Sequence, residues 1–88
     1  MKPARNTLEI LDFYADWCGP CRRDASDVAR LSAQGYKVTK VNVDHEPKKQ
    51  AEFHVTLLPT YVVLREGKEV FRTHSFVGLR SYLKNKAK

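Results

Sequence analysis

Apolar and polar residues alternate along the chain in a pattern that predicts four strands. Residues 8 to 14 are apolar at nearly every position, which is typical of a strand buried on both faces of a sheet. Residues 37 to 43 alternate valine with polar residues and indicate a second strand. Residues 61 to 64 and 68 to 72 flank a short turn, so we expect them to form an antiparallel hairpin.

Three helices are predicted between and after these strands. Pro20 suits the first position of a helix that continues to about Ala33, with Gly35 as its C-terminal cap. Further helices are expected over residues 47 to 53 and about 75 to 84. The order strand, helix, strand, helix, strand, strand, helix predicts an α/β fold with a four-stranded mixed sheet and helices on both faces.

The composition fits one soluble domain. The chain has 88 residues, of which 42% are hydrophobic and 30% charged, so we expect a single domain over residues 1 to 88 with its core at about 8 to 84. We also expect a monomer. No run approaches the about 18 apolar residues that span a bilayer, and residues 1 to 6 lack the features of a secretory signal. A cytoplasmic location without membrane contact is therefore expected.

The chain is basic, with sixteen Lys and Arg against ten Asp and Glu and a net charge of +6. Residues 65 to 88 carry seven positive and two negative side chains. These charges are scattered and accompany no nucleic-acid reading motif. We therefore expect a solvated basic face that favours acidic protein partners, without nucleic-acid binding.

The two cysteines, Cys18 and Cys21, are separated by two residues. This spacing suits a redox pair, half of a zinc site or a structural disulfide. Zinc needs about four ligands, and the other candidates, His45, His54 and His74, are separated by eight and nineteen residues. A permanent disulfide is uncommon in a reducing compartment. Redox chemistry is the favoured interpretation, and zinc and a structural disulfide are the alternatives.

Asp12 lies within the first apolar strand, on the same face as Ile10 and Tyr14 by the period of two. Aspartate is depleted in buried strands. Its position therefore indicates either a functional carboxylate or a satisfied ion pair.

Several segments resemble the thioredoxin family. The five residues from Trp17 to Cys21 match the family's active-site motif residue for residue. Other matching segments follow in the same order, namely Asp12-Phe13-Tyr14-Ala15-Asp16, Val41-Asn42-Val43-Asp44, Leu58-Pro59-Thr60 and Glu66-Gly67-Lys68. The resemblance covers roughly residues 8 to 84. It implies a minimal thioredoxin fold and a thiol-disulfide oxidoreductase that reduces protein disulfides without a cofactor or metal.

The resemblance implies unequal roles for the two thiols and for two charged residues. Cys18, just before the helix, is expected to be the nucleophile, because a helix N-terminus favours the thiolate. Cys21 is expected to resolve the mixed disulfide. Asp12 matches the family's buried proton acceptor, whose pKa burial should raise, and Lys40 on the neighbouring strand is its expected partner.

Substrate binding is expected around the motif. Pro59 stands at the family's cis-proline position, where the Leu58 backbone would pair with an extended substrate. Trp17 is expected to face the substrate, Gly19 to permit close approach and Pro20 to stiffen the link between the cysteines. The expected partners are disulfide-containing proteins, with a reductase or glutathione as electron donor.

The chain also departs from the family pattern. Thioredoxins usually begin with a further strand and helix, and we expect these to be missing because only seven residues precede the first predicted strand. His74 and Ser75 stand about where the family has a glycine beside the substrate. A second hypothesis is therefore a thioredoxin-fold interaction module whose basic face binds a partner and whose thiols are incidental.

Overall fold

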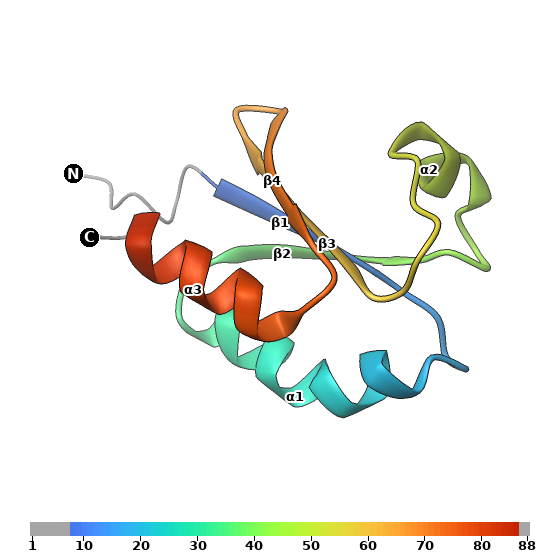
Figure 1. The fold of residues 1–88 in the computed structure, drawn as a ribbon, viewed down its shortest axis with the longest axis horizontal. Coiled ribbons are helices and arrows are strands. Elements are labelled where there is room, and N and C mark those ends of the chain that lie inside the picture. Colours follow the sequence, from blue (N-terminus) through green and yellow to red (C-terminus); the bar gives the residue numbers. More distant parts are fainter. Residues whose placement is uncertain (1–7, 87–88) are drawn as a thin grey trace.

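Seven elements follow one another in the order that the apolar pattern predicts (Figure 1). The structure is a computed structural model and describes residues 8–86. The predicted bounds of every element lie within two residues of the observed ones. The elements are β1 (Leu8–Tyr14), α1 (Gly19–Ala33), β2 (Lys37–Asn42), α2 (Pro47–Glu52), β3 (Thr60–Arg65), β4 (Lys68–Thr73) and α3 (Phe76–Lys86).

The strands form one mixed sheet in the order β2-β1-β3-β4. β1 runs parallel to β2 and antiparallel to β3, and β4 is antiparallel to β3. The predicted fold class is confirmed. β1 is a central strand with helices over both faces, which explains why its sequence is apolar on both sides. Its carboxyl end leads directly into the cysteine motif at the start of α1.

The helices divide between the two faces of the sheet, as predicted. α1 and α3 lie on one face and α2 on the other (Figure 1). The core beneath α1 and α3 contains Leu8, Ile10, Val28, Leu31, Tyr61, Val63, Phe76, Leu79 and Leu83. The core on the α2 face contains Leu11, Phe13, Ala15, Cys18, Cys21, Val41, Val43, Val55, Val62 and Leu64. Both cysteines are thus part of the packed interior.

Two tight connections depend on residues that tolerate a positive φ. Gly35 ends α1 at φ 101°, in the left-handed conformation that favours glycine after a helix. Glu66 and Gly67 have φ values of 51° and 83°, the signs required of a two-residue hairpin turn. The turn joins β3 to β4, as the sequence predicts.

Two sequence-based expectations lie partly or wholly outside the described residues. The expected absence of an N-terminal strand and helix and the expected absence of a secretory signal both concern residues before Leu8, which the structure does not describe. Between residues 8 and 86, none of the helices is long and apolar enough to cross a membrane.

Candidate active site

Cys18 and Cys21 are joined in a disulfide at the N-terminus of α1. Cys18 is the N-cap residue, with extended backbone angles, and its Sγ accepts a hydrogen bond from the Cys21 backbone N–H at 3.2 Å. The two residues are only 5% and 8% exposed. Pro20 follows at the start of the helix, where its missing N–H needs no partner. The local sequence therefore places one sulfur at the open end of the helix and the other inside its first turn.

The electrostatic surroundings of Cys18 favour negative charge. Backbone N–H groups at a helix N-terminus carry a partial positive charge, and the first turn of α1 contains no acidic residue. Arg22, in the same turn, adds a formal positive charge. The free N–H groups at this end of the helix are of the kind that favours a thiolate over a thiol.

Trp17 lies exposed beside the disulfide. Its side chain is 67% exposed, and its Nε1 donates a hydrogen bond to Asp44 Oδ2 at 2.8 Å. It borders an open hollow of about 500 Å³ that is also lined by Cys18, Gly19 and Leu58. Asp44 was not identified as a site residue from the sequence. Asp44 follows Trp17 by 27 residues in the chain. The fold brings the two together because the end of β2 lies beside the cysteine motif.

The Leu58–Pro59 peptide bond is cis, as the family resemblance implies. Leu58 lines the hollow beside Trp17. Pro59 is buried and lines a second hollow, of about 310 Å³, together with Pro20. The Thr60 hydroxyl donates a hydrogen bond to the Leu57 carbonyl and ties this connection together. The cysteine motif therefore has open space on two sides, beside Cys18 and beside Pro20, and residues of the α2–β3 connection border both.

Gly19 has open space above it. Apart from its chain neighbours and the nearby backbone of α1, a Cβ atom placed on Gly19 would meet no atom of the described residues within 4 Å. Packing inside the molecule therefore does not require glycine at this position. The space beside the disulfide is available to another molecule.

Asp12 lies behind the redox pair and is 4% exposed. The pKa of its carboxyl is raised from 3.8 to about 6, mainly by burial. The positive charge of Lys40 lowers this pKa, and the negative charge of Asp24 raises it. An open cavity of about 370 Å³ is lined by Asp12, Cys21 and Lys40 among others. The buried carboxyl and the second sulfur thus share a space that communicates with solvent.

Lys40 is the neighbour of Asp12 in the sheet register. Its Nζ lies over the ring of Tyr14, 4.5 Å from the centroid, in a cation–π arrangement. Among the described residues, the structure records no salt bridge between Lys40 and Asp12. Lys40 acts on Asp12 through its charge, which lowers the pKa of the carboxyl.

A second carboxylate, Asp24, was not identified from the sequence. It lies three residues after Cys21, and besides burial a side-chain hydrogen bond with Asp24 is among the causes that raise the pKa of Tyr61. Tyr61 is 1% exposed and faces Asp12 in the β1–β3 register. Burial is the largest cause that raises the pKa of Tyr61. The negative charges of Asp12 and Asp24 raise this pKa further. No sequence motif signals this pair, because it depends on α1 packing over β3.

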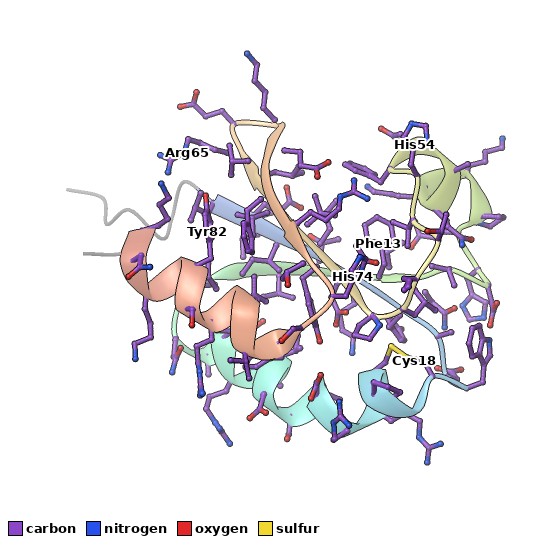
Figure 2. The ribbon with its side chains drawn as sticks, viewed as in Figure 1. Phe13, Cys18, His54, Arg65, His74 and Tyr82 are labelled. Atoms are coloured by element: carbon purple, nitrogen blue, oxygen red, sulfur yellow. A yellow bond between two sulfur atoms is a disulfide. The ribbon has the colours of Figure 1, made fainter. Side chains whose placement is uncertain are left out.

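The three histidines do not gather around the cysteines. Among residues 8–86, no group of three or more His, Cys, Asp and Glu side chains lies close enough to hold a metal ion. Figure 2 shows His54 beside α2, away from Cys18, whereas His74 lies nearer to the disulfide.

Comparisons with known proteins agree with this geometry. Residues 3–87 match the sequence model of the family described as Thioredoxin. A thioredoxin of Chlamydia trachomatis is 37% identical over 75 residues, which cover 83% of this chain and 71% of the relative. A thioredoxin of Mycoplasma pneumoniae is 37% identical over 76 residues, covering 84% and 74%.

Solved structures give the same result. The thioredoxin of Fasciola hepatica superimposes with a TM-score of 0.85 at 35% identity and covers 92% of this chain and 82% of its own. A thioredoxin of Nicotiana alata gives a TM-score of 0.86 at 30% identity, covering 97% and 79%. Together with the Cys18–Cys21 disulfide, these matches show that the chain belongs to the thioredoxin family and is a thiol-disulfide oxidoreductase.

Proposed function

We propose that this protein reduces disulfides in protein substrates by cycling Cys18 and Cys21 between dithiol and disulfide. The main support is the position of the Cys18 sulfur, which accepts the Cys21 N–H at the positive end of α1. In the reduced protein the Cys18 thiolate attacks one sulfur of the substrate disulfide. A mixed disulfide forms, and the other substrate sulfur leaves as a thiolate that takes a proton from water.

Cys21 completes the reaction. Its thiolate attacks the Cys18 sulfur of the mixed disulfide, re-forms the Cys18–Cys21 bond and releases the second substrate thiolate. Two electrons pass from the protein to the substrate. The position of Cys21 inside the first turn of α1, behind the N-cap residue Cys18, supports its assignment as the resolving thiol, because the sulfur at the open end of the helix meets a substrate first.

Asp12 is the proposed proton acceptor for Cys21. Asp12 and Cys21 line one cavity that opens to solvent, so the proposed path takes the proton from the thiol to Asp12 directly or through water. A pKa of about 6 leaves the carboxylate ready to accept a proton near neutral pH. Lys40, whose charge lowers the pKa of Asp12, keeps part of the carboxyl population ionised.

Substrates are proposed to bind over Trp17, Gly19, Pro20, Leu58 and Pro59. These residues border the hollow beside Cys18 and the second hollow beside Pro20. An extended substrate segment pairs with the Leu58 backbone in the manner of an added strand. The exposed Trp17 ring supplies apolar contact, and its hydrogen bond to Asp44 holds the ring in place.

Thioredoxins act on disulfide substrates and are reduced by a reductase. We propose that a reductase or glutathione regenerates the dithiol of this protein. We further propose that the chain works as a single-domain monomer in the cytoplasm and requires neither a membrane nor nucleic acid. The unclustered excess of basic residues supports acidic proteins as its preferred substrates.

The proposal is tested by reduction of a disulfide-bonded protein, such as insulin, with a reductant that recycles the enzyme. Wild type should accelerate the reaction, and Cys18→Ser should remove the acceleration while leaving the fold intact. Equal rates for wild type and Cys18→Ser would instead support the interaction module with incidental thiols. A redox titration against glutathione would then show whether the pair is poised to reduce or to oxidise substrates.

A further inference from the structure

His74 lies in the short connection between β4 and α3, at the end of the sheet that carries the disulfide (Figure 2). Its Nδ1 is 3.1 Å from the Thr60 hydroxyl and 3.3 Å from the Pro59 carbonyl oxygen. The imidazole is therefore held against the cis-proline segment, although 14 residues separate it from Thr60 in the chain.

The hydrogen bonds around His74 determine which ring nitrogen carries the proton. The single hydroxyl hydrogen of Thr60 is donated to the Leu57 carbonyl, so toward His74 the hydroxyl can only accept. The Pro59 carbonyl can also only accept. Nδ1 must therefore be the protonated nitrogen that donates to both. In the neutral ring, Nε2 then carries a lone pair and is an acceptor.

The Nε2 atom is available to a partner. Within residues 8–86, no hydrogen bond to His74 Nε2 is formed, and the residue is exposed. His74 lines the hollow of about 310 Å³ that also contains Pro20 and Pro59. The charged side chains facing this hollow are Arg23 and Asp24, which lie 3.5 Å apart.

We propose that His74 is a substrate-binding residue whose Nε2 accepts a hydrogen bond from a backbone N–H of the peptide beside the target cysteine. This inference rests on the protein-disulfide reduction proposed above. A peptide that crosses Cys18 and pairs with Leu58 continues over Pro59 toward this hollow. Two hydrogen bonds already restrain the imidazole, so binding immobilises little further side-chain freedom. A backbone N–H is present in every substrate, so this contact suits an enzyme with varied targets.

The neighbouring Ser75 has a different task. Its Oγ accepts the Gly78 backbone N–H and caps α3, and its own N–H is donated to the Thr73 hydroxyl. Ser75 is therefore engaged in ending β4 and starting α3. Of these two residues, both of which line the hollow, His74 is the one whose side chain keeps a polar atom without a hydrogen bond inside residues 8–86.

The test uses His74→Asn. The asparagine amide nitrogen occupies about the place of Nδ1 and keeps the bonds to Pro59 and Thr60, but nothing replaces Nε2. His54→Asn is the matched control, because His54 is exposed beside α2 and its φ of 54° suits asparagine. Each variant is assayed on insulin and on 5,5′-dithiobis(2-nitrobenzoate), a small disulfide without a peptide N–H.

Loss of one hydrogen bond should lower the kcat/KM of His74→Asn for insulin about threefold to tenfold, mainly through KM. The rate with the small disulfide should change much less, and His54→Asn should match wild type on both substrates. In His74→Gln, a carboxamide oxygen reaches toward the place of Nε2 and should restore part of the loss.

Unchanged kcat/KM of His74→Asn for insulin would overturn the assignment. An equal loss of kcat/KM on both substrates would also overturn the assignment. The substitution would then act on the Cys18–Cys21 pair of the enzyme and not on binding of the peptide. A wild-type enzyme that reduces the small disulfide but not insulin would contradict the proposed protein-disulfide reduction itself, and the His74 assignment with it. An active wild type with an unaffected His74→Asn would contradict the His74 assignment alone.

Discussion

Replacing Asp12 by Asn should stabilise the oxidised protein at neutral and alkaline pH. Burial raises the pKa of this carboxyl from 3.8 to about 6, so the folded state holds the proton more tightly than the unfolded chain does. The contribution of Asp12 to stability is full below pH 3.8 and is lost as the pH rises through about 6. Asparagine never carries the buried charge and avoids this loss.

The size of the effect follows from the pKa. A change from 3.8 to about 6 corresponds to about 3 kcal/mol between the two protonation states. Asp12→Asn should therefore raise the free energy of unfolding by up to about 3 kcal/mol at pH 8. At pH 4 the difference should fall below about 1 kcal/mol, because Asp12 of the folded protein is then largely protonated and that of the unfolded chain partly so. Urea unfolding of both oxidised proteins at the two pH values measures this difference.

The same variant tests the proton-acceptor role. Asparagine cannot take the proton of Cys21, so release of reduced substrate from the mixed disulfide should slow about a hundredfold or more, as is usual when a general base is removed. The first attack by Cys18 should change little. Rapid-mixing experiments with acid quench and mass spectrometry separate the two steps. A variant no more stable than wild type at pH 8 would refute the buried-charge reasoning, and an unchanged release rate would refute the proton transfer.

Three further substitutions test neighbouring parts of the site. Asp44→Ala removes the acceptor of the Trp17 indole N–H, so we expect a changed emission spectrum of this single tryptophan and a loss of less than about 1 kcal/mol in urea unfolding. Asp24→Asn removes a charge that raises the pKa of Asp12, so carboxyl NMR titration should place that pKa lower, and an unmoved pKa would contradict the coupling. Gly19→Ala should change the free energy of unfolding by no more than about 0.5 kcal/mol, since the added Cβ has open space around it. Its kcat/KM for insulin should fall, because the added methyl group occupies space beside Cys18 that the substrate needs.

Local sequence patterns were sufficient to predict the elements and their order. The apolar run of β1 indicated a central strand, and the Glu66–Gly67 turn indicated the β3–β4 hairpin, because both features arise from neighbouring residues. The position of Cys18 before the helix followed in the same way from Pro20. The cis peptide at Pro59 could be expected only from the family resemblance, since a proline by itself favours trans.

Contacts between distant segments could not be predicted from the sequence. The bonds from Trp17 to Asp44 and from His74 to Thr60 join residues 27 and 14 positions apart, and no local pattern encodes them. The placement of Lys40 over Tyr14 also depends on side-chain packing at the edge of β2. Sequence analysis identified Lys40 as a charged neighbour of Asp12 but could not show that the two form no direct salt bridge.

The central claim, that Cys18 attacks and Cys21 resolves, is tested most directly by trapping the mixed disulfide. Reduced Cys21→Ser and Cys18→Ser proteins are mixed with a disulfide-bonded protein, quenched with acid and examined by intact mass spectrometry. We predict a stable covalent adduct through Cys18 in Cys21→Ser and little adduct in Cys18→Ser, whose remaining thiol lies inside the first turn of α1 and not at its open N-terminal end. Adduct formation at equal rates in both variants, or only in Cys18→Ser, would contradict the assigned roles.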